Sequence, residues 1–309
     1  MNEKEFFQIL KLDTLQSCRD YMKVMTDFYF DVFYATSPKP VKSISINDAR
    51  TWFQMMFSKG VHFTKVLDGF DYSKGTLHLN QITDHTVLFS LVRDMFESYM
   101  AFRLIYTLPD TEQQSDLLYF LFVHAGLQER FSNTPEDVKK NNSEWVQDQL
   151  QQINACKQNL YENELYVNNE GVRKVVDNAL KPNVNKYRYR FAENNQMVFV
   201  HYEQEETLKQ LGINSSVLEG MYHYFSLMTH PSAVAIDQFS VAYEKPEEGS
   251  VVLASTATRY AITILSLFIR EYAKLFPEVK NLFSMQPAPQ CQLISLYGDI
   301  VIKDAHRRS

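Results

Sequence analysis

Residues that interrupt helices are rare in this chain. Only 9 Gly and 10 Pro occur among 309 residues, whereas 22 Phe and 18 Tyr supply large side chains that need a core. Scarce breakers and many bulky side chains favour long, well-buried helices. We therefore expect an all-α fold built as an irregular multi-helix bundle. Alternating residues on both sides of Ala192 to Gln196 predict one small β-hairpin near 187–202.

The few breakers divide the chain into segments. Apolar residues at helical spacing predict helices over 3–34, from Asn47-Asp48 toward Gly60, and from Thr83-Asp84 to Leu108, with a loop over 68–80. Further helices are expected over these ranges: 116–131, 145–161, 216–230 and 251–275. We interpret residues 1–80 as an N-terminal helical region, 81–285 as the main bundle and 286–309 as a C-terminal tail.

Charge and cysteine content narrow the class of protein. The formal net charge is −6, which gives no broad positive field for nucleic acid. The three cysteines are scattered without a C-x-x-C pair, and residues 1–5 lack the pattern of a secretory signal. We expect a reduced, cytoplasmic protein. The most apolar stretch, 251–269, carries Arg259 at its centre, which favours a buried core helix over a membrane span.

One polar stripe runs along the helix that the pattern from Ser216 to Glu219 predicts. Tyr222, Ser226 and His230 follow each other at intervals of four, so on a helix they share an arc of about 80° beside an apolar seam. One interpretation is local: hydrogen bonds within the helix and a histidine at its C-terminal end. The other makes these three residues catalytic, with His230 moving a proton near neutral pH.

Two other apolar helices carry similar thin strips. The first contains the i,i+4 pair Arg93 and Glu97, and the second contains Ser255, Arg259, Thr263, Ser266 and Arg270. If the three strips met, Arg93, Arg259 and Arg270 could bind an anion and Glu97 could orient one of them. The ligand would then be RNA or a phosphorylated small molecule. The alternative for Arg93 and Glu97 is a structural ion pair.

The pattern Tyr222-x-x-Phe225-Ser226-x-x-x-His230-Pro231-Ser232, with Arg93-x-x-x-Glu97 far upstream, resembles that of uncharacterised bacterial all-helical families. These families are loosely similar to HEPN and abortive-infection proteins. The resemblance spans about 83–275 and implies a helical bundle with a link to RNA cleavage or phage defence.

Other chemistry has little support in the sequence. No H-E-x-x-H or paired Glu-x-x-His motif indicates a metal, and no G-x-G-x-x-G or P-loop indicates a cofactor. Four basic residues interleaved with aromatics could bind single-stranded nucleic acid or simply guard a hairpin edge: Lys181, Lys186, Arg188 and Arg190. Two functions stay open. The favoured one is an interaction or sensor module with a polar, anion-binding cleft, for which a protein partner is one expectation. The alternative is a metal-independent, HEPN-like ribonuclease or phosphoester-directed enzyme.

Overall fold

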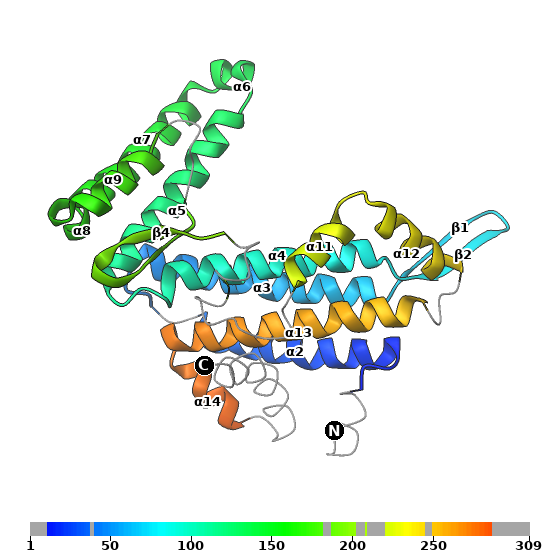
Figure 1. The fold of residues 1–309 in the computed structure, drawn as a ribbon. Coiled ribbons are helices and arrows are strands. Elements are labelled where there is room, and N and C mark those ends of the chain that lie inside the picture. Colours follow the sequence, from blue (N-terminus) through cyan, green and yellow to red (C-terminus); the bar gives the residue numbers. More distant parts are fainter. Residues whose placement is uncertain are drawn as a thin grey trace. The chain divides into compact units, whose positions relative to one another are not determined.

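The computed structural model describes residues 11–37, 40–181, 187–201, 208, 220–244 and 249–285. The fold is all-α, as predicted, with two small antiparallel hairpins among the helices (Figure 1). The helices are α2 (Leu15–Thr36), α3 (Ile44–Leu67), α4 (His85–Tyr106), α5 (Glu112–Asn133), α6 (Glu136–Asn141), α7 (Ser143–Glu162), α8 (Glu164–Asn168), α9 (Glu170–Ala179), α11 (Met221–Thr229), α12 (Ala233–Glu244), α13 (Gly249–Leu275) and α14 (Glu278–Met285). The strands are β1 (Phe70–Lys74), β2 (Leu77–Ile82), β3 (Tyr189–Phe191) and β4 (Met197–Phe199).

The chain forms two compact units. The first contains residues 1–100 and 202–309, and the second contains residues 101–201. The sequential regions 1–80, 81–285 and 286–309 stay a prediction, because compact units are not necessarily independently folding domains. The tail, 286–309, lies outside the described residues.

An aromatic cluster forms the centre of the first unit. The Tyr29 and Phe53 rings stack with centroids 4.9 Å apart, and Phe53 lies 4.4 Å from the ring of Tyr272. The buried Tyr29 hydroxyl donates to the carbonyl of Leu265 at 2.7 Å. These contacts join α2, α3 and α13 over a large apolar area, which is the main source of stability in such a core. Gly60 allows α3 to approach α2 closely, since a Cβ there would lie 3.3 Å from Thr26 Cγ2.

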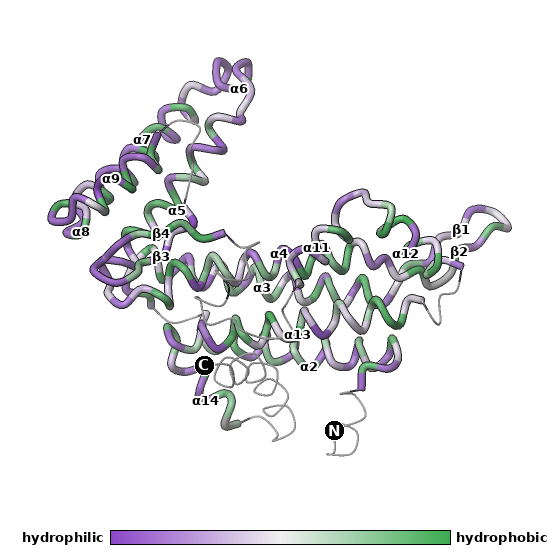
Figure 2. Tube along the Cα trace, in the orientation of Figure 1, coloured by the Kyte–Doolittle hydropathy of each residue, from purple (hydrophilic) through white to green (hydrophobic). Residues whose placement is uncertain are grey.

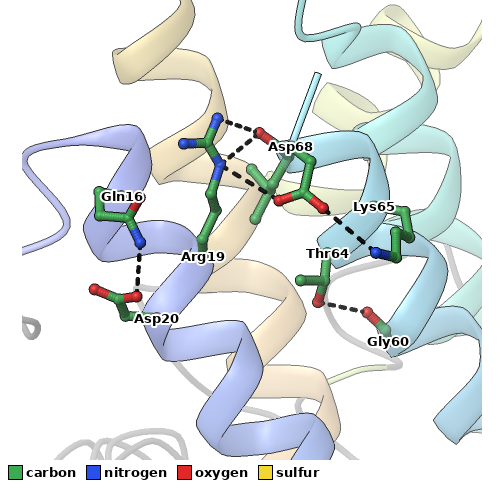
Figure 3. A network of polar contacts seen from close by, with 8 residues as sticks. Gln16, Arg19, Asp20, Gly60, Thr64, Lys65 and Asp68 are labelled. Atoms are coloured by element: carbon green, nitrogen blue, oxygen red, sulfur yellow. Dashed lines mark hydrogen bonds and ion pairs between the residues drawn. The ribbon is translucent and has the colours of Figure 1, made fainter. Parts of the chain in front are cut away.

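A polar network ties the start of α2 to the end of α3 (Figure 3). The Arg19 guanidinium donates from Nε and Nη2 to the carbonyl of Leu67, at 3.0 and 2.9 Å. Its Nε also lies 3.6 Å from Asp68 Oδ1, and Lys65 Nζ lies 3.7 Å from Asp68 Oδ2. Leu67 is in the last turn of α3, where carbonyls lack helical partners and a cation is favoured.

The prediction of a loop over 68–80 was wrong. Residues Phe70–Lys74 and Leu77–Ile82 form the antiparallel hairpin of β1 and β2, with Tyr72 opposite Leu79 and Lys74 opposite Leu77. Gly75 adopts a φ of 62°, the left-handed conformation that a tight turn between these strands requires. The alternation of Phe70, Tyr72, Leu77 and Leu79 was the signal for strands, but the cluster of turn-prone residues obscured it.

Helix boundaries differ from the predictions mainly at the N-terminal ends. α2 begins at Leu15 after the capping residue Thr14, whose Oγ1 accepts from the Ser17 amide at 3.0 Å. α3 begins before Asn47-Asp48, because Ser43 caps it instead. The expected helix over residues 3–10 lies outside the described part of the chain, and so does the expected cap at Ser216.

The second unit is a helical hairpin with a small β-ribbon. α5 packs against α7, where Phe131 and Trp145 stack with centroids 6.3 Å apart and Arg130 hydrogen-bonds to Gln149. Hydrophilic residues predominate along α6, α7 and α9 (Figure 2). The predicted hairpin near 187–202 is confirmed: β3 pairs with β4, with Tyr189 opposite Phe199. Lys186, one of the four basic residues that precede or belong to this hairpin, lies outside the described residues.

α13 is the most apolar long helix. By length and composition it could cross a membrane, but 78% of its most apolar window is buried inside the protein. This burial is what a central core helix requires, as expected for 251–269. Cytoplasmic location stays a prediction.

Candidate functional site

Aromatic contacts bring the polar strip of α4 to α11 within the first unit. Phe89 of α4 meets Tyr224 edge-on with ring centroids 5.2 Å apart and lies 6.1 Å from Phe225. Phe225 continues into an edge contact with Tyr260 of α13 at 5.1 Å. Since these apolar side chains occupy the seam between the helices, the polar residues beside them on α4 and α11 are placed against one another.

Arg93 is the centre of the resulting cluster. Its Nε donates to Glu97 Oε1 at 3.1 Å, its Nη2 donates to the Tyr222 hydroxyl at 3.2 Å, and its Nη1 lies 3.0 Å from His230 Nε2. The guanidinium carbon also lies 5.2 Å from the centroid of the Tyr222 ring, within range for a cation–π contact. The structure therefore brings together four of the seven predicted site residues. We call Arg93, Glu97, Tyr222 and His230 the Arg93 cluster.

The hydrogen bonds of the Arg93 cluster have determined directions. Tyr222 accepts from Arg93 and donates its own proton to Glu97 Oε1 at 3.2 Å, so three residues close a ring. Burial lowers the pKa of Arg93, but the hydrogen bonds that it donates to Glu97 and Tyr222, and its electrostatic interactions with both, outweigh burial and raise the pKa above the usual value. The guanidinium stays charged and can only donate. His230 Nε2 must then accept, which places the imidazole proton on Nδ1.

His230 lies at the C-terminal end of the helix that carries Tyr222 and Ser226, as the local interpretation expected, but it is not part of the helical run to residue 230 that was predicted. α11 ends at Thr229, and His230 is the C-cap residue with an extended backbone, φ −94° and ψ 151°. Pro231 explains this, because the residue before a proline is driven out of the helical region. The amide of His230 still donates to the carbonyl of Ser226 at 3.1 Å. From this position outside the helix, the His230 side chain reaches Arg93.

An open pocket adjoins the Arg93 cluster. It has a volume of about 310 Å³ and lies between the start of α4 and the α11–α12 connection. Most of its lining is apolar, and among the described lining residues His230 is the one with a ring nitrogen. The lining residues are Thr86, Met228, Thr229, His230, Pro231, Ala235, Ile236 and Phe239. This size is at the lower end of small-molecule sites, which combine apolar walls with a few polar groups.

The remaining predicted site residues lie apart from the Arg93 cluster. Ser226 is on α11 between Tyr222 and His230, but within the described chain its hydroxyl makes no hydrogen bond to His230, and the two residues share a backbone hydrogen bond instead. Arg259 donates to the carbonyl of Lys11 at 3.4 Å, near the start of α2. Arg270 is about 16 Å farther along α13, given the rise of a helix. One small anion could not contact both of these arginines and Arg93.

Part of the α13 strip lies inside the core. Ser255 and Thr263 are buried; Ser255 donates to the carbonyl of Leu12 at 2.6 Å and Thr263 to that of Arg259 at 2.7 Å. Three polar strips were expected to meet. Among the described residues, the strips of α4 and α11 do so. Thr86, Ile236 and Phe239 were not predicted from the sequence, because apolar and hydroxyl residues that line a pocket look like any half-buried helix face.

Within the described residues, no group of three or more His, Cys, Asp or Glu could hold a metal ion. No protein-family model, curated protein or solved structure matches the chain.

Proposed function

We propose that the protein is an interaction or sensor module that binds a small molecule in the pocket beside His230. The observation that carries the proposal is the Arg93 cluster: a guanidinium holds the acceptor nitrogen of His230 at 3.0 Å, on a residue that lines an apolar pocket of about 310 Å³. The His230 Nδ1–H remains as a donor, since the described residues provide no partner for it. A ligand with an apolar body and a hydrogen-bond acceptor fits these features.

Charge compensation favours binding over an arginine-driven reaction. Three different nitrogens of Arg93 already have partners, and the carboxylate of Glu97 balances its charge at 3.1 Å. Arg93 therefore orients His230 more than it attracts an anion. A nucleophile paired with a base is what covalent catalysis needs, and Ser226 and His230 are joined only through the backbone.

A ribonuclease or phosphoester-directed enzyme of HEPN-like type is the alternative, with His230 as its proton-transfer group. It differs from the binding module in one measurable respect: the wild-type protein would consume RNA, and the His230→Ala protein would not.

Two probes and two tryptophan variants test the proposal. 2-Naphthol and 2-naphthyl phosphate share an apolar body that the pocket can hold, and saturation-transfer NMR reports their binding. Ile236→Trp places an indole in the pocket lining, at a side chain that is 68% exposed. Val252→Trp is the matched control, because Val252 is 66% exposed on α13 and does not line the pocket.

We expect at least one probe to bind the wild-type and Val252→Trp proteins and to be lost from Ile236→Trp, with no turnover of single-stranded RNA by any of them. Equal binding by Ile236→Trp, or no binding by the wild type, would overturn the proposed pocket. RNA turnover that His230→Ala abolishes would replace the module with the enzyme.

A further inference from the structure

A histidine without hydrogen bonds is buried next to the pocket. His85, at the first turn of α4, has no exposed surface, and within the described residues neither Nδ1 nor Nε2 has a partner. One of these nitrogens must carry a proton at any pH, so at least one donor is unsatisfied. A buried polar group without a partner destabilises the folded protein, and such groups in native proteins usually have a water or ligand as their partner.

Two neighbouring residues connect His85 to the pocket. Thr86, the next residue, lines it, and so does Phe239 of α12, whose ring meets the His85 ring with centroids 6.5 Å apart. Next to Phe239, Gln238 also has a buried side-chain oxygen without a partner in the described part of the chain. The Phe239 ring thus lines the pocket and also contacts the unpartnered imidazole of His85.

His85 is suited to an uncharged partner. Burial lowers the pKa of His85, although the nearby charge of Asp84 opposes this. The Asp84 carboxylate is itself occupied: its Oδ1 accepts from the Thr86 amide at 2.9 Å, the Thr86 hydroxyl at 2.6 Å and the Val87 amide at 3.2 Å. The neutral imidazole of His85 offers one donor and one acceptor, which is the complement of a hydroxyl group.

We propose that His85 is a second recognition group of this pocket and that the natural ligand is uncharged, with a ring or branched apolar body and a hydroxyl group. The ligand body lies against Met228 and Ile236, the Phe239 ring turns aside, and the hydroxyl hydrogen-bonds to the His85 imidazole. This inference rests on the proposed function, since it names the ligand class of the same pocket.

An anionic ligand is disfavoured at this position. A carboxylate or phosphate beside His85 would lose its hydration in a fully buried environment and would need a cation there. The positive charge of Arg93 is already balanced by the carboxylate of Glu97. A hydroxyl loses less hydration and satisfies a group that is otherwise unpaired, so the gain comes from both partners.

The test compares three probes of the same size and shape: 2-naphthol, naphthalene and 2-naphthoate. Dissociation constants are measured by ligand-observed NMR for the wild type, for His85→Phe and for His62→Phe, an exposed histidine of α3 that serves as the matched control. We expect 2-naphthol to bind the wild type and the control about fivefold more tightly than naphthalene, as one hydrogen bond gives. In His85→Phe this preference should disappear while naphthalene binds as before.

His85→Phe also reports on the protein without ligand. Replacing an unsatisfied buried imidazole by an apolar ring should leave the thermal midpoint unchanged or raise it. A large fall in that midpoint would mean that His85 already has a structural partner and would overturn the proposal. His85→Leu, which creates no overpacking, repeats the measurement if His85→Phe fails to fold.

The outcomes separate the two proposals. Binding of 2-naphthoate at least as tight as that of 2-naphthol, or a 2-naphthol preference that survives in His85→Phe, would overturn the role of His85 and keep the pocket. Failure of all three probes to bind the wild type would overturn the role of His85, and failure of 2-naphthyl phosphate as well would overturn the proposed pocket.

Discussion

Arg93 Nη1 and His230 Nε2 lie 3.0 Å apart although 137 positions separate the two residues in the chain. Because a guanidinium only donates, this contact requires the Nδ1–H tautomer of His230. Most exposed neutral histidines do not favour the Nδ1–H tautomer by themselves. The Arg93 cluster therefore sets the hydrogen-bonding character of the His230 imidazole, which lines the pocket.

The tautomer of His230 is directly measurable. In the wild type, long-range ¹H–¹⁵N correlation spectra at pH 8 should show His230 predominantly in the Nδ1–H form. Arg93→Ala removes the donor and should shift the population toward the Nε2–H form. His62, an exposed residue of α3, serves as the internal reference. A wild-type spectrum dominated by the Nε2–H form would contradict the contact.

The ring of Arg93, Glu97 and Tyr222 should contribute to stability. Tyr222→Phe keeps the aromatic ring over the guanidinium but removes both hydroxyl hydrogen bonds, so we expect a loss of about 1 kcal/mol in the free energy of unfolding. Arg93→Ala should cost about 2 kcal/mol; Glu97, 32% exposed, can then be hydrated, which limits the loss. Urea denaturation of both single variants and the double variant measures the coupling, and strictly additive losses would show that the residues do not interact.

Arg19 should stabilise the first unit through the end of α3. Arg19→Ala removes two hydrogen bonds to the Leu67 carbonyl, at 3.0 and 2.9 Å, and we expect a loss of about 2 kcal/mol in the free energy of unfolding. Lys23→Ala is the control on the same helix, because its pair with Asp27 leaves both side chains mostly exposed, at 70% and 64%, and such pairs contribute little. Similar urea midpoints for the two variants would count against the capping role of Arg19.

Acid should weaken the second unit through His124. Burial, together with the charge of Lys157, lowers the pKa of His124 to about 4, whereas the unfolded chain has the ordinary value of 6.5. Between these values the unfolded state binds more protons, so stability falls as the pH decreases from 6.5 to 4, by about 3 kcal/mol in total.

His124→Leu should remove this part of the pH dependence. The difference in unfolding free energy between His124→Leu and the wild type, followed by urea denaturation at pH 7, 5.5 and 4.5, should shift in favour of the variant as the pH falls. His201→Gln, at an exposed position of the same unit, should keep the wild-type slope. Parallel curves for all three proteins would mean that His124 is hydrated or paired.

The helices and several of their ends could be read from local sequence. The spacing of apolar residues and Pro109 located α4, and a long apolar stretch of sequence located α13. Both signals could be read locally because they act within a few turns of one helix. The hairpin of β1 and β2 was missed, since Gly75 and its neighbours indicate a turn without saying whether strands flank it.

The candidate site was only partly foreseeable. Helical spacing singled out Arg93 with Glu97 and Tyr222 with His230, yet periodicity cannot state which faces of different helices meet. It also placed His230 on a helix, whereas Pro231 ends that helix one residue earlier. Arg259 looked equivalent to Arg93 in the sequence, and packing of α13 against α2 sent it to the carbonyl of Lys11 instead.

Local propensity and burial patterns, which depend on neighbours within a few residues, determined that this chain is helical, which of its helices are central and which polar residues interrupt their apolar faces. The tertiary structure alone decided that Arg93 contacts His230, that the hydroxyl residues of the α13 strip lie in the core, and that His85 is buried beside a pocket. These relationships depend on which helix faces pack together, and that choice is made by the summed contacts of side chains such as Phe89 and Phe225 from distant parts of the chain.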